Sequence, residues 1–344
     1  MSLSPRTVGI AAAVVTVAIW TGFIVIGRAS AGHTLLPFDI ALLRILGAGA
    51  VLLPWGWVLA RRAGPDGRSL AGFSPLPLRP TVLTGLFGGL VYAILCYAGF
   101  FYAPAAHAAV LMPGSLPLWT ALLAVPLLGE RITAARALGL GCIVAGDLVV
   151  GGSGLLSAFD GGQVWKGDLI FMSAAFCWSA YSVLARRFGL DPVRATIAIT
   201  VLAFFVDVPA FALLAGSGLL PTRLAQAPWG ELAFQALFQG VGSVVISGIT
   251  FVQMVRVFGP VRSTMITALV PGLSALGAVL LLGEPLGLNL LAGLALVTAG
   301  ILFGVRAARP ATPDLIAVGA RQTSAGAVKR GLLVFSAISD GTQS

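Results

Sequence analysis

The long apolar stretches of this chain contain few side chains able to do chemistry, and two of those carry opposite charges. Arg44 lies in the second stretch, where its guanidinium could receive a substrate carboxylate or phosphate through two parallel hydrogen bonds. Asp207 lies deep in the seventh stretch and could pair with an amine or take up a proton during transport. The alternative is structural: Arg44 could be satisfied by a helix end or a neighbouring acid, and Asp207 could be that acid.

Two further ionisable residues fall in apolar stretches. Asp147 is in the middle of the fifth stretch, and His107 begins the fourth. An ionised group in hydrocarbon must face a partner or a wet cavity. The place of Asp147 in the fifth stretch favours a role in a packing or oligomer contact. His107 is either a hydrogen-bonded structural residue or a proton switch.

A polar stripe runs along the eighth apolar stretch. Gln235, Gln239 and Ser243 recur at four-residue spacing, which places them on one face of a helix. Tyr92 and Cys96 have the same spacing in the third stretch. Such a stripe either lines a cavity or bonds neighbouring helices, and the two matching stripes favour the cavity.

Several aromatic residues lie away from the helix ends, where interfacial belts normally occur. They could enclose an apolar or cationic substrate by stacking and cation–π contact, or they could fill the core. Trp20 and Trp178 occupy equivalent positions in the two halves described below, which favours a place beside a central site. The aromatic candidates are Trp20, Tyr97, Trp119, Trp178 and Tyr181.

The composition requires elements that cross a membrane to position these residues. Hydrophobic residues make up 58% of the 344 positions and charged residues only 10%, so the chain cannot cover itself with a water-facing surface. The net charge of +9 is spread between the apolar stretches rather than gathered in one patch, which argues against a nucleic-acid partner. The three cysteines have no metal-site spacing and are interpreted as packing residues.

Ten stretches are long enough to span a bilayer core, which needs roughly 20 residues per helix. Glu130 and Glu284 at two helix ends are interpreted as structural, and Pro113, Pro117 and Pro271 as kinks. The expected helices cover 7–27, 36–60, 81–103, 105–127, 135–152, 167–187, 193–215, 231–255, 260–283 and 286–306.

Lys and Arg set the orientation because cytoplasmic loops carry an excess of them. With the N-terminus inside, 17 basic residues fall on the cytoplasmic side and only Arg28, Lys166 and Arg223 fall outside. This distribution predicts an even number of helices with both termini cytoplasmic, in a bacterial inner membrane.

The chain contains an internal repeat. The run 127–130, Leu-Leu-Gly-Glu, recurs at 281–284, and Trp20 and Arg28 correspond to Trp178 and Arg186. Five helices is an odd number, so the second copy must enter the membrane from the opposite side. The predicted fold is an all-α membrane protein of ten transmembrane helices in two inverted five-helix repeats. The expected parts are a first repeat at 1–153, a periplasmic linker at 154–166, a second repeat at 167–306 and a disordered cytoplasmic tail at 307–344.

Two five-helix units, each with an early Trp, a Pro in the fourth helix and Leu-Gly-Glu at that helix's end, resemble the EamA family of the drug/metabolite transporter superfamily. The resemblance covers residues 7–306 and implies a carrier that exports amino acids, amines or related metabolites. Pro285 departs from the family's usual basic residue, which the inverted orientation explains. The matching residues are Pro37, Arg44, Ala105-Ala106, Val110-Leu111, Pro117 and Leu128-Gly129-Glu130-Arg131 in the first half, and Gly167-Asp168, Trp178, Arg186, Gly259-Pro260, Pro271 and Gly283-Glu284 in the second.

An intramembrane hydrolase and a passive channel are the alternatives to a carrier. An intramembrane hydrolase could use Ser153 in the run 151–154, Gly-Gly-Ser-Gly, but this serine is expected in a loop without a buried base. A passive channel would need a filter loop or a charged ring, and the sequence has neither. No Walker loop occurs, so transport is expected to be independent of ATP, with no cofactor or metal. The expected partners are a small-molecule substrate and the lipid bilayer, with the chain acting as a monomer or homodimer. Coupling to protons is an open alternative to exchange or equilibration of the substrate.

Overall fold

The computed structural model describes residues 4–30, 32–62, 64, 67–157, 162–259, 262–263, 266–267, 269–285 and 287–306. Within them, eight helical segments are long and apolar enough to cross a membrane, and two shorter apolar helices follow at Leu269–Leu282 and Leu288–Phe303. Each of the ten predicted stretches corresponds to one of these segments. The described residues form no strand, only an isolated bridge between Ser69 and Ser74. The prediction of an all-α, multi-pass membrane protein is therefore confirmed.

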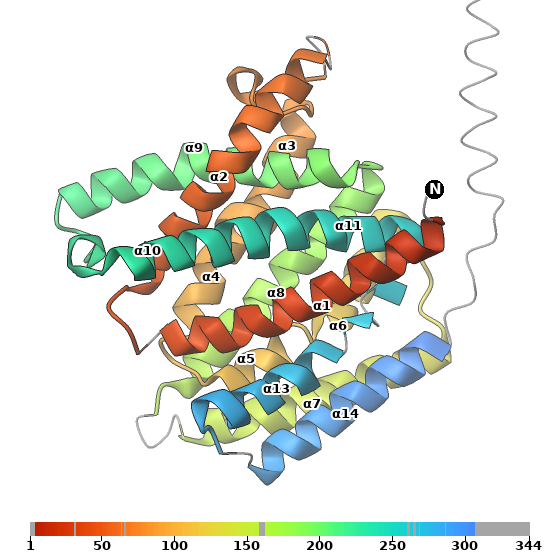
Figure 1. Cartoon of the computed structure of the whole chain (residues 1–344). Coiled ribbons are helices and arrows are strands. Elements are labelled where there is room, and N and C mark those ends of the chain that lie inside the picture. Colours follow the sequence, from red (N-terminus) through yellow and green to blue (C-terminus); the bar gives the residue numbers. More distant parts are fainter. Residues whose placement is uncertain are drawn as a thin grey trace, which may run out of the picture. The chain divides into compact units, whose positions relative to one another are not determined.

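Figure 1 shows the order of the elements along the chain. Three of the membrane-crossing segments are composite, being built from α3, η2 and α4, from α5 and α6, and from α10, η5 and α11. The elements are α1 (Pro5–Ser30), α2 (Pro37–Arg62), η1 (Leu70–Gly72), α3 (Leu78–Gly85), η2 (Leu86–Leu90), α4 (Val91–Gly99), α5 (Ala105–Leu111), α6 (Leu116–Leu128), α7 (Ala134–Ser157), α8 (Val164–Arg187), α9 (Pro192–Gly216), η4 (Leu224–Gln226), α10 (Trp229–Gln235), η5 (Ala236–Ile246), α11 (Ser247–Phe258), α13 (Leu269–Leu282) and α14 (Leu288–Arg306).

The fifth predicted helix is longer in the structure than the sequence indicated. Helix α7 continues to Ser157, so Ser153 lies within a helix and not in the expected loop. Backbone groups inside a bilayer must be satisfied within the segment, which favours helix even through a glycine-rich run. The linker predicted at 154–166 falls partly on residues 158–161, which lie outside the described residues, as does the whole predicted tail at 307–344.

The fourth membrane segment is interrupted as its prolines predicted. Helix α5 ends at Leu111 and α6 begins at Leu116, with Pro113 in the turn between them and Pro117 in the first turn of α6. A proline is tolerated in the first turn of a helix but breaks a helix interior. Pro271 likewise lies in the first turn of α13. The kink predicted for it would lie just before Leu269, where residue 268 is outside the described residues, so the kink stays a prediction.

The repeated Leu-Gly-Glu motif ends α6 and α13 in the same way. Gly129 and Gly283 have φ of 71° and 67°, a left-handed conformation that only glycine adopts without strain. The backbone N–H of Glu130 donates to the carbonyl of Ala124 at 3.3 Å, and that of Glu284 donates to Ala278 at 3.2 Å. These bonds satisfy carbonyls that a helix end would otherwise leave unpaired, so the motif is a helix C-cap used twice.

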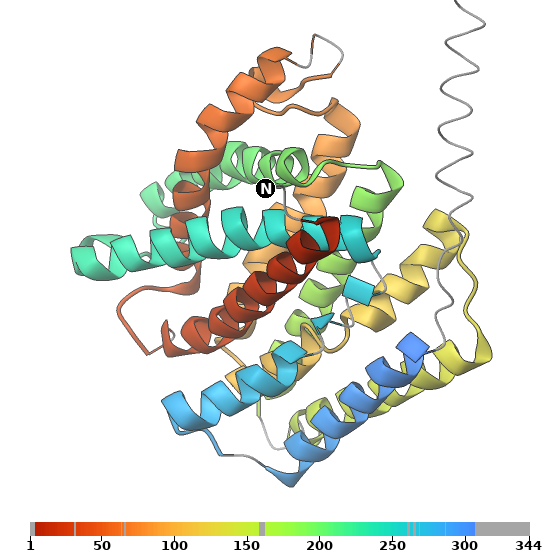
Figure 2. The ribbon, with the colours of Figure 1, turned by 45° about the vertical axis from the view of Figure 1, so that its right-hand side comes forward.

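Helices α7 and α14 pack side by side, as Figure 2 shows. The contact is made by glycines: a Cβ added at Gly293 would lie 2.9 Å from the carbonyl oxygen of Gly146, and one at Gly300 would lie 2.5 Å from that of Gly139. Small residues allow this approach, which supplies much of the packing between helices in a membrane. Under the repeat, Gly139 corresponds to Gly293 and Gly146 to Gly300, so each contact is the counterpart of the other.

Two π-helical segments, η2 and η5, occur within the third and eighth membrane segments, and neither was predicted. They lie where other helices cross closely. A Cβ at Gly240 of η5 would be 2.8 Å from the backbone of Gly47 in α2, and one at Gly89 of η2 would be 2.6 Å from the carbonyl oxygen of Ile199 in α9. Such π-segments are often found at functional sites, and η5 contributes Ser243 to the lining of the cavity described next.

Candidate functional site

A buried cavity lies where α1, α2, α4, α8, η5 and α13 meet, and it is called the central cavity below. Its volume is ≈ 30 Å³, which leaves room for no more than one or two water molecules. The turn that interrupts the fourth membrane segment also reaches it. The lining residues are Trp20, Phe23, Ile24, Arg44, Tyr92, Met112, Pro113, Leu116, Ala175, Trp178, Ser243 and Val270.

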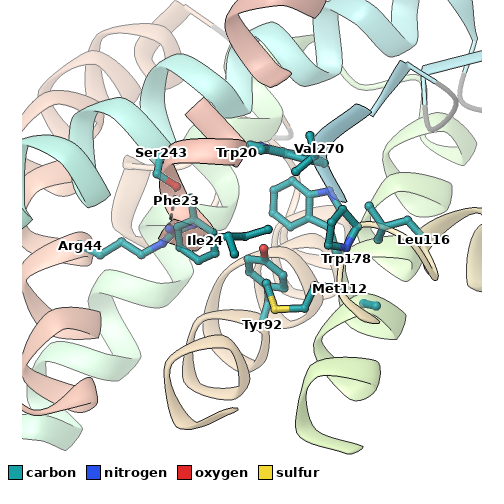
Figure 3. A pocket seen from close by; sticks show the side chains of 12 residues that line it. Trp20, Phe23, Ile24, Arg44, Tyr92, Met112, Leu116, Trp178, Ser243 and Val270 are labelled. Carbon is teal, nitrogen blue, oxygen red and sulfur yellow. Dashed lines mark hydrogen bonds between the residues drawn. The ribbon is translucent and has the colours of Figure 1, made fainter. Parts of the chain in front are cut away.

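One side of the central cavity is polar. The Nη1 of Arg44 donates to the Oγ of Ser243 at 3.0 Å, and the guanidinium lies over the Phe23 ring, 5.5 Å from its centroid. Figure 3 shows Arg44 and Ser243 together, across the view from the two tryptophans. Arg44 is only 6% exposed, and none of the ion pairs among the described residues includes it. Ser243 takes one of the five guanidinium N–H donors and the Tyr97 hydroxyl interacts with another, so Arg44 retains donors suited to a carboxylate.

The other side is aromatic. The Trp20 and Trp178 rings meet edge to face with centroids 5.7 Å apart, and Tyr92 lies 4.7 Å from Trp178. Phe251 stacks behind Trp20 at 5.0 Å, and Tyr181 packs behind Trp178 at 5.1 Å. Ring faces of this kind attract an organic cation as well as apolar groups. A ligand between the two sides would meet a cationic group at one end and aromatic rings at the other.

A second, larger cavity of ≈ 330 Å³ lies by the loop between α1 and α2 and is called the α1–α2 cavity. Tyr97 lines it, and the Tyr97 ring lies 6.0 Å from that of Phe23 in the central cavity. These two rings therefore stand between the cavities. Its lining includes three basic residues and is made by Gly27, Arg28, His33, Leu35, Leu36, Pro37, Ile40, Tyr97, Phe100, Phe101 and Arg223.

The structure brings together some of the predicted site residues. Four of them, Trp20, Arg44, Tyr92 and Trp178, line the central cavity. Tyr181 lies in the layer behind Trp178 and is fully buried. Trp20 and Trp178 were predicted because they occupy equivalent positions in the two halves.

The residues of the polar stripe, Gln235, Gln239 and Ser243, have different roles: one lines a cavity and two bond neighbouring helices. Ser243 lines the central cavity, whereas the other two residues bond neighbouring helices. Gln235 donates through Nε2 to the Oγ of Ser30 at 2.7 Å, and Gln239 accepts at 3.1 Å from the hydroxyl of Tyr97. Gln239 therefore supports the wall between the two cavities and does not line either one.

Three other predicted residues lie away from the central cavity. His107 bonds through Nδ1 to Asp168 at 2.8 Å, and Trp119 packs edge to face on Phe176 at 5.5 Å. Asp207 does not line the central cavity, and none of the ion pairs among the described residues joins it to Arg44. The pairing of Arg44 with Asp207, weighed from their equivalent helices, is thus wrong. Equivalent helices need not present their charged residues to each other.

The sequence reasoning missed Phe23 and Met112. Phe23 lies one helical turn after Trp20, so the 3.6-residue period could have placed it on the same face. Met112 lies in the interruption beside Pro113, and a break in a helix exposes side chains that a continuous helix would direct elsewhere.

Two ion pairs join the two halves at the glutamates of the repeated Leu-Gly-Glu motif, and neither was predicted. Arg28 Nε bonds to Glu284 at 3.0 Å between α1 and α13, and Arg186 Nη1 bonds to Glu130 at 2.6 Å between α8 and α6. Arg28 corresponds to Arg186 and Glu284 to Glu130 in the internal repeat. Each pair therefore links one half to the equivalent helices of the other. Glu130 also binds Arg136 at 3.0 Å, which agrees with its structural interpretation.

A bundle of membrane-spanning helices around a buried, partly polar cavity is typical of membrane transporters. The EamA-like transporter family matches residues 7–152 and 165–306, in two copies that cover most of the chain. The chain belongs to this family, whose members are transporters and not enzymes.

Similar proteins agree with this assignment. The chain is 26% identical over 222 residues to "Uncharacterized transporter YyaM" of Bacillus subtilis (strain 168), covering 64% of this chain and 71% of that protein. It is 29% identical over 171 residues to human "Solute carrier family 35 member F6", covering 46% of this chain and 44% of that protein. A solved crystal structure shares the fold with a TM-score of 0.57 at 24% identity, covering 89% of this chain and 99% of the other.

Proposed function

We propose that this membrane transporter is an ATP-independent carrier that moves small metabolites, such as amino acids or amines, out of the cell by alternating access. The observation that carries the proposal is the central cavity, where buried Arg44 keeps free donor capacity opposite Trp20 and Trp178. A buried guanidinium with no carboxylate partner among the described residues is costly in a membrane core unless it serves a ligand or a water-filled path.

The site chemistry favours a zwitterion or an organic amine. A substrate carboxylate would receive hydrogen bonds from Arg44, and an ammonium would lie against the rings of Trp20, Trp178 and Tyr92. Ser243 holds the guanidinium in the orientation that this requires.

The size of the central cavity supports movement between states. Ligand sites typically need about 300 Å³ or more, whereas this cavity has ≈ 30 Å³. A substrate can therefore enter only if the surrounding helices separate. The Phe23–Tyr97 contact would open toward the α1–α2 cavity, which already has ≈ 330 Å³.

The arrangement proposed for this movement is two inverted repeats, residues 1–153 and 167–306, joined by a linker at 154–166. Its support is the exchange of equivalent contacts: Arg28–Glu284 with Arg186–Glu130, and Gly146–Gly293 with Gly139–Gly300. A two-fold relation between halves produces such reciprocal pairs. Rocking of one half against the other would open the site to each side in turn.

The proposed setting is a bacterial inner membrane with both termini, and the tail 307–344, in the cytoplasm. The 17-to-3 distribution of basic residues supports this orientation. The proposed partners are the bilayer and a small-molecule substrate, with no nucleic acid, and a monomer or homodimer as the working unit.

The test is uptake and counterflow of radiolabelled amino acids, polyamines, nucleosides and organic acids in proteoliposomes. We expect saturable flux of one class, lost in Trp178→Ala and retained in Trp229→Ala, a tryptophan that is 85% exposed and outside the cavity. Absence of flux for every compound in a folded, oriented preparation would contradict the proposal.

Proton coupling is tested in the same liposomes. Asp207→Asn should abolish the response of flux to a pH gradient, and a retained response would remove Asp207 from that role.

A further inference from the structure

A third cavity lies among α6, α7 and α8, apart from the central cavity, and is called the lateral cavity. Its volume is ≈ 250 Å³, and it shares no lining residue with the central cavity. Leu148 and Leu169 at its edge are 60% and 54% exposed, so it lies at the lipid-facing side of the helices. The lining residues are Leu111, Leu118, Trp119, Val144, Asp147, Leu148, Gly151, Gly152, Trp165, Asp168, Leu169 and Met172.

This otherwise apolar cavity contains two buried carboxyl groups. Asp147 is 7% exposed, and neither of its carboxyl oxygens has a hydrogen-bond partner. Asp168 is 6% exposed and bonds to His107 through Oδ1 only, so its Oδ2 is also without a partner. That Oδ2 faces Gly151, one turn from Asp147 on α7, since a Cβ at Gly151 would lie 3.6 Å from it.

Three carboxyl oxygens without a hydrogen-bond partner in one apolar cavity are complementary to a cation. A buried polar group without a hydrogen bond is unfavourable, and an unpaired carboxylate is more so. The described residues place no basic side chain in the lining, because His107 bonds Asp168 from outside it. They also contain no group of three metal-ligating side chains close enough to hold a metal ion.

The remaining lining identifies the kind of cation. Trp119 and Trp165 provide aromatic rings, and leucine, valine and methionine side chains provide an apolar surface. A hydrated inorganic ion gains nothing from such walls, whereas an ammonium attached to an apolar body is complementary to both parts of the cavity.

We propose that the lateral cavity binds an amphiphilic organic ammonium ion, with the ammonium between Asp147 and Asp168 and the apolar body against Trp119, Leu148 and Leu169. The ammonium could belong to a free hydrophobic amine or to a lipid headgroup. His107 acts as a positioning residue that fixes the Asp168 carboxyl through its Oδ1.

The probe for this site is phenethylammonium, with uncharged phenethyl alcohol as the matched control. Binding of the tritiated probe is measured on protein in phosphatidylglycerol nanodiscs. We expect Asp147→Asn to weaken binding by about tenfold or more, since a hydrogen-bonded ion pair is lost. Asp207→Asn, an acid outside this cavity, should bind as the parent chain does. Equal binding of phenethyl alcohol, or unchanged binding by Asp147→Asn, would overturn the proposal.

A second variant tests the proposal independently if Asp147→Asn fails to fold. Gly152 lines the lateral cavity, and a Cβ there has nothing within 4 Å, so Gly152→Leu should fill the cavity without a backbone clash. It should abolish probe binding and leave substrate flux through the central cavity unchanged; retained binding would overturn the proposal. Repeating the titration in phosphatidylethanolamine nanodiscs identifies the source: weaker apparent binding assigns the site to the lipid ammonium, and equal binding to a free amine.

Discussion

At the scale of single residues, Arg44 has the most demanding environment in the central cavity. Its Nη1 donates to the Oγ of Ser243, and its guanidinium carbon lies 5.5 Å from the centroid of the Phe23 ring; a guanidinium can make both contacts at once. Arg44, Trp20, Tyr92 and Trp178 could be placed at the site from sequence because polar groups are rare in a membrane and equivalent positions mark an axis. Asp207, Gln235, His107 and Trp119 could not be excluded, because the rotation of each helix about its own axis is set by packing.

Arg44→Lys keeps the charge but loses the planar fork, so it should reduce flux of the transported compound by about tenfold or more, the effect of losing a charged hydrogen bond. The control is Arg61→Lys on the same helix, where the guanidinium lies 3.5 Å from the Trp57 ring centroid, outside the cavity. Its flux should match that of the parent chain. If both variants transport alike, Arg44 is a structural cation and does not bind substrate.

At the scale of elements, the sequence predicted helix positions well and helix interruptions in part. The Gly129 and Gly283 caps and the break at Pro113 follow from local backbone chemistry, which any stretch of sequence displays. The π-segments η2 and η5 do not, because they arise where a distant helix crosses at Gly47 or Ile199. The continuation of α7 past residue 152 was missed for a similar reason: glycine indicates a break in water but less so in a membrane.

The glycine contacts between α7 and α14 predict that adding a methyl group there will destabilise the protein. A Cβ at Gly293 would lie 2.3 Å from Val150 Cγ2, so Gly293→Ala should lower the free energy of unfolding by about 1–3 kcal/mol through overpacking. Gly141→Ala on α7 is the control, because its Cβ has nothing within 4 Å. Thermal unfolding in detergent should show a lower midpoint for Gly293→Ala alone. Equal midpoints would mean that α7 and α14 do not pack through these glycines.

At the scale of the whole molecule, the proposed mechanism rests on the reciprocity of the two halves. In the orientation proposed above, the Arg28–Glu284 pair between α1 and α13 lies toward one membrane face, and the Arg186–Glu130 pair between α8 and α6 lies toward the other. The sequence shows which positions of the two halves correspond. It does not show which helices of one half contact which helices of the other. If the halves rock, each pair must break when its own face opens. Loss of one partly exposed pair should therefore favour opening at that face by about two- to fivefold.

Accessibility of the central cavity from both faces tests this account most directly. Both alanines are buried, but Ala175 lines the central cavity and neighbouring Ala174 lines none of the cavities described. Cysteines at these positions therefore form a matched pair once Cys96, Cys142 and Cys177 are replaced. A membrane-impermeant thiol reagent should label Ala175→Cys from either side of oriented vesicles and leave Ala174→Cys unlabelled. Adding Arg28→Ala should speed labelling from outside, and adding Arg186→Ala should speed it from inside. Labelling from one side alone in every variant would contradict alternating access.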